Sequence, residues 1–154
     1  MTSALTPSGQ VKVMIKPLNQ DQLRELLRKE RLGRLGCIVD GGPYVVPVNY
    51  VFDGECAYLH SLPGSKIHAM RASPRVCLQV DEIDDELNWK SVLAFGVYEE
   101  ITNPKERAEA LNDLLARFSR LTPVESFIAG DASAPAPIVF RIRINRLTGI
   151  REGG

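Results

Sequence analysis

The sequence predicts a mainly β protein, in which a small antiparallel barrel is flanked by helices. Short apolar runs separated by turn residues extend from Leu35 to about Asp81, and the first three runs are joined by only a few residues. Parallel strands need crossover connections of a dozen or more residues, so these strands must be antiparallel. The segments after Asn19 and Asn103 have the apolar spacing of helices instead, and they flank the sheet.

Composition restricts the class of protein. The chain has 154 residues and a hydrophobic content of 44%, which suits one domain with one core. Its 19 lysines and arginines balance 19 acidic residues, so no overall charge favours a nucleic acid or an anionic membrane as partner. The N-terminal segment has no leader pattern, and no apolar run is long enough to cross a bilayer. We therefore expect a cytoplasmic protein.

The cysteines and histidines do not have the spacing of a metal site. Cys37, Cys56 and Cys77 each lie in an apolar strand-like run without CxxC spacing, which predicts buried free thiols. His60 and His68 are too few and too poorly spaced to form a zinc site with these cysteines. We expect no bound metal.

The order of elements follows from the changes of period along the chain. Residues 1–18 are expected to form an extended N-terminal arm, and residues 19–150 a single domain. A helix capped by Asn19 is expected to end near Gly33, and a second long helix is expected after Asn103, with Pro104 in its first turn. The expected strands are Leu35–Asp40, Tyr44–Phe52, Cys56–His60, Val76–Val80, about Lys90–Ile101, and a last strand from Ile138.

The connections between these elements have turn and loop compositions. Gly41–Pro43 and Asp53–Gly54 are predicted to join the first three strands as turns. A short helix is expected after the third strand. The acidic segment DEIDDELN before the fifth strand is predicted as a loop, and so is the segment Thr122–Pro137, which is rich in proline, alanine and serine.

The stretch YLHSLPGSKIHAMR predicts an anion site where the short helix begins. Ser65 and Lys66 follow Pro63 and Gly64, so a hydroxyl, an ammonium and unpaired backbone N–H groups come together at a helix N-terminus, which suits a phosphate. The Walker pattern is absent, which disfavours a nucleotide triphosphatase. An ordinary serine-capped surface helix is the alternative that these residues alone leave open.

The strand before this stretch contains a proline. Pro47 lies within VVPVNY and cannot donate to a sheet ladder, so this strand must be irregular or at an edge of the sheet. A planar, partly apolar ligand lying along Val46 to Tyr50 would have the sheet as a wall and the start of the helix as its phosphate anchor.

These motifs resemble those of the flavin-binding split-barrel superfamily, over about residues 20–147. The resemblance is to the pyridoxamine 5′-phosphate oxidase-related branch, which includes nitroimidazole-resistance (Nim-type) proteins. Its most specific parts are GRL, YVVPVNY, the block Y-x-H-S followed by G-x-K and R-x-S-P-x-V-C, and the strand SV-x-x-x-G. The resemblance implies a six-stranded antiparallel split β-barrel with two long helices and a short helix after the third strand.

The resemblance also implies a homodimer that holds two FMN molecules at the subunit interface. By this resemblance, Pro47, Val48 and Asn49 would face the isoalloxazine or ribityl chain of FMN, and His60 and Ser61 would touch its ribityl and phosphate region. Ser65 and Lys66 would bind the phosphate. Trp89, Lys90 and Ser91 would reach FMN from the other subunit. Other roles stay open for three of them: Asn49 facing solvent, His60 as a hydrogen-bonded strand end, and Trp89 as an interface hydrophobe.

The C-terminus departs from that of the vitamin oxidases. Those enzymes have a C-terminal signature of tryptophan, arginine and histidine, whereas this chain ends in RIRINRLTGIREGG. The resemblance therefore implies an FMN-dependent oxidoreductase that is not a pyridoxamine phosphate oxidase. It would use NADH or NADPH to reduce a small electrophile such as a nitroaromatic compound or a quinone. The alternatives are a flavin- or haem-binding protein without turnover, with His60 or His68 as an axial haem ligand, and a dimeric domain with an empty anion corner.

Overall fold

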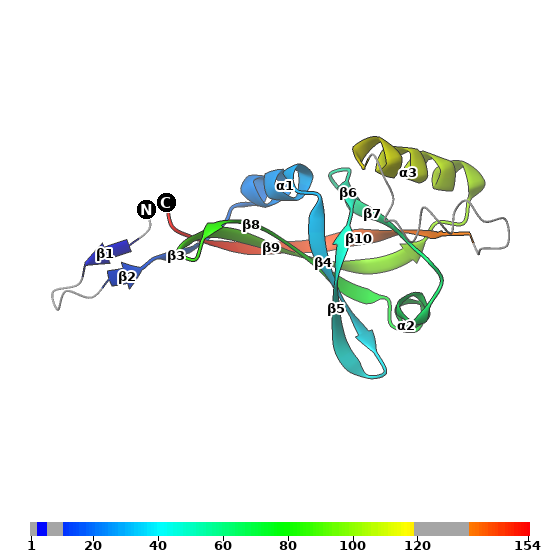
Figure 1. Ribbon diagram of the computed structural model, residues 1–154, viewed down its shortest axis with the longest axis horizontal. Helices are drawn as coiled ribbons and strands as arrows, with labels where there is room; N and C mark the ends of the chain where they lie inside the picture. The colour runs from blue at the N-terminus through cyan, green and yellow to red at the C-terminus, as the bar shows by residue number, and fades with distance from the viewer. Residues whose placement is uncertain (1–2, 6–10, 119–135) are drawn as a thin grey trace.

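The computed structural model describes residues 3–5, 11–118 and 136–154, and in this part of the chain three helices pack on an elongated, curled antiparallel sheet (Figure 1). The helices are α1 (Gln20–Lys29), α2 (Ser65–Ala72) and α3 (Pro104–Arg117). The strands are β1 (Ser3–Leu5), β2 (Val11–Val13), β3 (Ile15–Pro17), β4 (Leu32–Val39), β5 (Gly42–Asn49), β6 (Val51–Phe52), β7 (Cys56–Ser61), β8 (Arg75–Asp85), β9 (Asn88–Glu100) and β10 (Ile138–Glu152). The predicted mainly β class is confirmed.

The connection between β5 and β6 determines how the sheet curls. The strand order is β5-β4-β8-β9-β10-β7-β6, and β3 pairs with the end of β10. β5 and β6 therefore lie at opposite edges of the sheet, although only Tyr50 separates them in the sequence. One residue can join two opposite edges only if the sheet curls until these edges meet. This curled sheet is the predicted split barrel, and β5 is the edge strand that Pro47 required.

Tyr50 holds this junction in place. Its side chain is fully buried, and its hydroxyl donates a hydrogen bond of 2.6 Å to the carbonyl oxygen of Leu27 in α1. Burial raises the pKa of this hydroxyl, so the hydroxyl stays a neutral donor. The single strand expected over Tyr44–Phe52 is wrong, because Tyr50 turns into the core and divides the segment into β5 and β6. This division and the addition of β3 give the main sheet eight strands in the described residues, rather than six.

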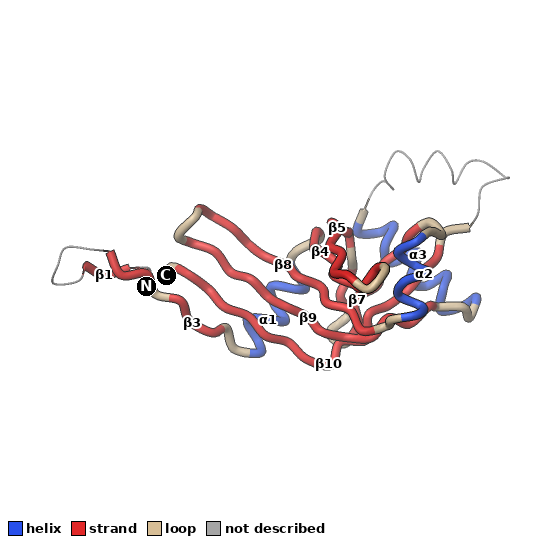
Figure 2. Tube along the Cα trace, turned by 90° about the horizontal axis from the view of Figure 1, so that it is seen from below, coloured by secondary structure: helices blue, strands red, loops and turns tan. Residues whose placement is uncertain are grey.

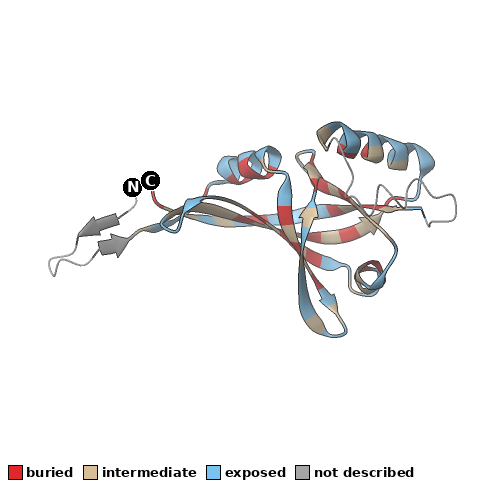
Figure 3. Cartoon of the chain, in the orientation of Figure 1, coloured by how far each residue is buried: buried red, intermediate tan, exposed pale blue. Residues whose placement is uncertain are grey.

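One face of the sheet, which we call the inner face, holds the core (Figure 3). The opposite side of the same strands is the outer face. Core residues come from alternate positions of the strands and from the buried sides of α1 and α2. They include Leu35, Leu78, Val80, Ala94, Ile142, Leu23, Leu27, Ile67 and Met70.

The first helix begins at the predicted residue but ends earlier than predicted. The side chains of Asn19 and Gln22 each accept a hydrogen bond from the backbone N–H of the other, at 2.9 and 3.0 Å, which is a capping box. The helix ends at Lys29, and Gly33 is already part of β4. A Cβ atom at Gly33 would lie 2.9 Å from Cδ1 of Leu78, so this glycine allows β4 to approach β8 and does not end the helix.

The acidic segment before the fifth strand was predicted as a loop, and this prediction is wrong. β8 continues to Asp85 and pairs with β9, with Asp81 opposite Ser91 and Asp85 opposite Asn88. The carboxylate of Asp85 closes the turn, because it accepts hydrogen bonds from the backbone N–H of Leu87 and the side-chain amide of Asn88. The resulting hairpin extends beside β10, away from the closed end of the barrel (Figure 2).

The remaining elements lie at the two ends of the chain. Within the expected N-terminal arm, β1 pairs with β2, and β3 pairs with β10. Asn103 caps α3 by accepting hydrogen bonds from the backbone N–H groups of Lys105 and Glu106. On the predicted apolar side of α3, Leu114 is buried but Leu115 is exposed. Almost all of the predicted loop at 122–137 lies outside the described residues.

No helix in the described parts of the chain combines the length and the apolar character that a bilayer span requires.

A bulge interrupts the pairing of β9 with β10. The register shifts between Ile144 and Arg146, so Asn145 is an extra residue in β10. Gly96 lies opposite Ile144. A Cβ atom at Gly96 would overlap the carbonyl oxygen of Arg143 and would lie 2.7 Å from Cγ2 of Ile142. The backbone of β10 can therefore approach β9 at the bulge only because residue 96 is glycine.

We expect Gly96→Ala to lower the free energy of unfolding by about 1–3 kcal/mol, because the added methyl group must displace the backbone of β10. Urea denaturation of the variant and of the wild type measures this loss. Gly36→Ala is the matched control, because its added Cβ would meet no atom closer than 3.6 Å. Equal stability of the Gly96 variant and the wild type would contradict the close approach.

Glu99 holds two arginines on the outer surface of β10. It accepts hydrogen bonds from Nε of Arg141 at 2.8 Å and from Nε of Arg143 at 3.0 Å. These two guanidinium groups lower the pKa of Glu99 from its ordinary value of 4.5 to about 2. A carboxyl group with a lowered pKa stabilises the folded state at pH values above its pKa in the unfolded chain. This stabilisation disappears as the pH falls toward its pKa in the folded protein.

We expect Glu99→Gln to lower the free energy of unfolding by about 1 kcal/mol at pH 7, because solvent screens this partly exposed ion pair. The difference from the wild type should shrink as the pH falls from 4.5 to about 2, the window set by the two pKa values. Urea denaturation at several pH values measures it. Glu109→Gln, in an exposed position of α3, is the control. A difference that persists unchanged at the lowest pH would show that the carboxylate charge is not its source.

Candidate functional site

A continuous row of residues crosses five strands on the outer face. Strand register places Val45 opposite Gly36, Gly36 opposite Cys77, Cys77 opposite Phe95, and Phe95 opposite Arg146. Neighbouring strands are about 4.8 Å apart, so this row spans about 19 Å from β5 to β10. It forms a mainly apolar strip with a cation at one end.

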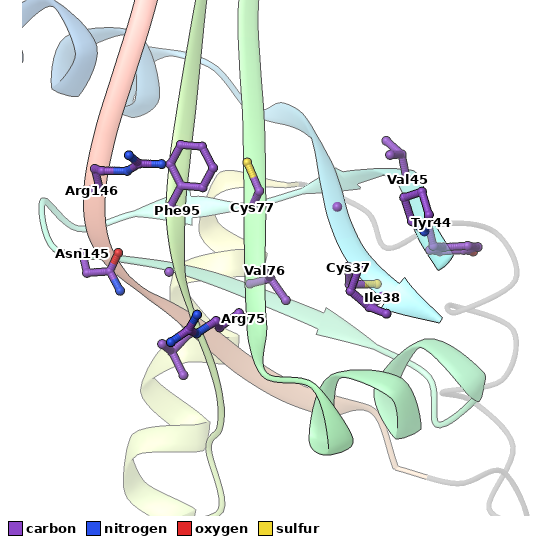
Figure 4. Close-up of a pocket in the computed structure, with 14 residues that line it drawn as sticks. Cys37, Ile38, Tyr44, Val45, Arg75, Val76, Cys77, Phe95, Asn145 and Arg146 are labelled. Carbon is purple, nitrogen blue, oxygen red and sulfur yellow. The ribbon is translucent and has the colours of Figure 1, made fainter. Parts of the chain in front are cut away.

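This row forms the floor of a groove with a volume of about 580 Å³ (Figure 4). The groove is also lined at the β4–β5 hairpin by Cys37, Ile38, Pro43 and Tyr44, and at its other end by Arg75 and Asn145. Gly36 leaves the floor open, because a Cβ atom there would come no closer than 3.6 Å to Cys77 and would point into the groove. The absence of a side chain at this position gives a flat molecule room to lie against the sheet.

A polar network continues the outer face beside the groove. Arg34 donates to Asp81 at 3.1 Å, and the side-chain amide of Gln79 donates to Asp81 and to the hydroxyl of Ser91, each at 3.0 Å. Pro47 pairs with Arg34 across β5 and β4. The network therefore joins Arg34, the register neighbour of the predicted site residue Pro47, to the predicted site residue Ser91 within one subunit.

The predicted anion corner lies at the start of α2. Gly64 is the N-cap residue, its conformation is extended, and no side chain caps the first turn of the helix. A Cβ atom at Gly64 would meet nothing within 4 Å, and Ser65 is exposed, so a ligand can reach the backbone here. This corner offers accessible backbone N–H donors beside the exposed Ser65 at a helix N-terminus, which is where the sequence predicts an anion site.

The charge of Lys66 acts on a cysteine of β4. Burial raises the pKa of the Cys37 thiol, and the Lys66 ammonium acts against this effect. The Cys37 side chain belongs to the core cluster, which α2 also joins, so this interaction belongs to the packing of α2 against β4. At the middle of the groove, burial likewise raises the pKa of the Cys77 thiol, and the charge of Arg146 opposes the rise. Of these two thiols, that of Cys77 lies in the outer row, and the charge of Arg146 acts on it.

The structure brings some of the predicted site residues together and separates others. By strand alternation, Pro47, Asn49, Trp89 and Ser91 share the outer face with the groove, whereas the side chain of Val48 packs against the core. The ammonium of Lys90 lies 3.9 Å from Glu82 and pairs with it.

His60 and Ser61 are at the end of β7, opposite Val139 and Ile138 of β10, and the Ser61 hydroxyl donates to the carbonyl oxygen of Leu62. They do not line the groove. Their roles, and those of the other predicted cofactor contacts, stay predictions.

Sequence reasoning missed the residues at the far end of the groove. Arg75, Phe95 and Arg146 hold no fixed position of a local motif, and they meet Cys77 only because β8, β9 and β10 pair in this register. The alternation of Leu93, Phe95 and Val97 on one side of β9 was the available signal for an outer apolar face. Within the described residues, no group of three or more histidine, cysteine or acidic side chains could hold a metal ion.

Comparison with known proteins assigns the family. The sequence model of the family described as pyridoxamine 5′-phosphate oxidase matches residues 19–151, which is most of the chain. The chain belongs to the pyridoxamine 5′-phosphate oxidase family. The resemblance stated from the sequence motifs is therefore confirmed.

Two relatives are each 32% identical to this member of the pyridoxamine 5′-phosphate oxidase family. One is an uncharacterized protein of Rhizobium meliloti, aligned over 146 residues, 89% of this chain and 95% of the relative. The other is the crystal structure of an FAD-binding protein from Mesorhizobium loti, with a TM-score of 0.74 over 91% of this chain and 99% of that one.

A more distant structure shows the fold alone. A candidate 5-nitroimidazole antibiotic resistance protein from Bacteroides thetaiotaomicron has 19% identity and a TM-score of 0.68, over 90% of this chain and 89% of that one.

Proposed function

We propose that this protein is a flavoprotein that holds FMN in the outer-face groove. The observation that carries the proposal is the accessible anion corner at Ser65 and Lys66, at the start of a helix that packs against β4, which is also a strand of the open apolar groove. The open floor at Gly36 and the accessible backbone at Gly64 fit a ligand that has a flat ring and a phosphate. The FAD-binding relative from Mesorhizobium loti supports a flavin.

The residues of the groove have distinct roles in this proposal. Ser65, Lys66 and the first N–H groups of α2 would bind the phosphate, while Val45, Gly36 and Cys77 would carry the ring. The corner offers one cluster of phosphate donors, which favours the single phosphate of FMN over the pyrophosphate of FAD. Chromatography of the flavin released from the purified protein distinguishes the two cofactors.

The activity that we propose is the transfer of two electrons from NADH or NADPH to a small electrophile such as a nitroaromatic compound or a quinone. A bound flavin supplies the redox chemistry, and the protein supplies position and electrostatics. With a quinone, the overall reaction consumes NAD(P)H and one proton and yields NAD(P)⁺ and the hydroquinone. The groove residues of this chain orient the acceptor and keep water from the apolar floor.

The outer face also supports a homodimer. The hairpins at its two ends carry apolar side chains that are exposed in a single subunit, with 67% of Val45 and 63% of Ile83 accessible. Exposed apolar surface of this kind is typical of an interface between subunits. We propose that a second copy covers this face and closes the groove, as the sequence resemblance implies.

We expect the purified protein to be yellow or to become yellow when FMN is added. Lys66→Ala should weaken FMN binding about 10- to 100-fold, because it removes a charged donor to the phosphate. FMN should also protect Cys77 from alkylation, which peptide mass spectrometry measures without any turnover. Lys105→Ala, on the exposed surface of α3, is the control. The absence of flavin absorbance after FMN addition, or a Soret band after haem addition that is lost in His60→Ala, would contradict the proposal.

We expect the wild type to sediment as a dimer at micromolar concentration. Ile83→Lys should raise the dimer dissociation constant at least about tenfold, because it buries an unpaired charge in the interface. Analytical ultracentrifugation over a dilution series measures this constant. Leu115→Lys, at an exposed apolar position on α3, should leave the protein dimeric. A monomeric wild type would contradict the proposed interface.

A further inference from the structure

The end of the groove on β8 and β10 carries positive charge. Arg75, Asn145 and Arg146 line it and are exposed. Figure 4 shows the Arg75 side chain reaching across β9 toward β10, where Asn145 and Arg146 lie. No residue of α2 lines the groove, so this end is separate from the anion corner. The groove therefore has donor groups at this end beside an apolar floor.

The arginines at this end differ from three other arginines on the same sheet. Arg34 pairs with Asp81, and Arg141 and Arg143 both pair with Glu99. Within residues 11–118 and 136–154, in contrast, no carboxylate pairs with the guanidinium of Arg75 or Arg146. Arginine planes bind carboxylates through two parallel N–H donors, so these two groups have donors available for a ligand.

Arg146 is held in place by the aromatic ring beside it. Its guanidinium carbon lies 4.2 Å from the centroid of the Phe95 ring. Stacking covers one face of the guanidinium plane, but the N–H groups on its edge stay directed sideways. Phe95 thus orders the side chain of Arg146 while leaving its donors accessible at the groove. Less rotamer freedom is then lost when a ligand binds.

The bulge in β10 explains how neighbouring residues come to line the same groove. In a regular strand, Asn145 and Arg146 would point to opposite faces. The register shift between Ile144 and Arg146 removes this alternation, and both residues line the groove. The approach of β10 that accommodates the bulge depends on Gly96, as described above. Bulges frequently re-aim side chains beside binding sites.

We propose that Arg75, Asn145 and Arg146 form a carboxylate-binding subsite that selects a small, planar, anionic electron acceptor. The two guanidinium groups and the amide supply donors for the carboxylate oxygens, and Phe95, the part of the apolar row not assigned to the flavin ring, contacts the conjugated body of the acceptor. As a statement about an acceptor, the inference rests on the proposed function. As a statement about binding, it can be tested with or without flavin.

Isothermal titration calorimetry with para-nitrobenzoate and its neutral analogue para-nitrobenzamide tests the subsite. We expect the flavin-loaded wild type to bind the carboxylate at least about tenfold more tightly than the amide. Arg146→Met and Arg75→Met should each reduce carboxylate affinity about tenfold and change amide affinity less than about twofold. Arg31→Met, which removes an exposed arginine outside the groove, should leave both affinities unchanged.

The outcomes separate this inference from the proposed function. Suppose that the protein binds flavin but binds para-nitrobenzoate and para-nitrobenzamide equally tightly, or that both arginine variants keep the wild-type affinity for para-nitrobenzoate. Either result would overturn the subsite and leave the flavoprotein proposal standing. A preference for para-nitrobenzoate that depends on both arginines in a protein that binds no flavin would support the subsite and overturn the flavoprotein proposal. Circular dichroism of each variant verifies that it is folded.

Discussion

The junction at Tyr50 is the constraint on which the rest of the structure depends. It joins the two edges of a seven-strand path through one residue, so the sheet must curl around a single core. The bond from the Tyr50 hydroxyl to Leu27 attaches α1 to that junction, and a buried donor without its partner would cost about 1–3 kcal/mol. Once the sheet is curled, the alternation of side chains assigns each residue of β4, β8 and β9 to the core or to the outer face.

This assignment determines where a binding site can lie. The apolar residues of α1 and α2 join the inner core, so these helices do not cover the outer groove. The groove is therefore built on paired strands, which hold side chains more rigidly than loops do. Its shape comes from small departures from regular structure: no side chain at Gly36 and an extra residue at Asn145.

Sequence reasoning succeeded where the determining interactions are local. Helix caps at Asn19 and Asn103, the alternation in β9, the edge position of Pro47 and the composition of the corner at Ser65 are all set within a few residues. It failed where distant strands decide the structure. A glycine at position 33 is typical of a helix end, but here it allows β4 to approach β8 closely. The acidic segment forms a strand because it pairs with β9. The row from Val45 to Arg146 needs the register of five strands, which no single segment specifies.

The exposed outer face connects the cofactor, the dimer and the acceptor in one physical argument. A flat apolar strip beside an open sheet edge favours aggregation unless something covers it. A planar cofactor in the groove and a second subunit that packs on the hairpins and closes the groove would together cover this face. The cationic end would then be the part that stays polar, because desolvating Arg75 and Arg146 without an anion is unfavourable. An anionic ligand at that end would supply the charge partner that no carboxylate of the described residues provides.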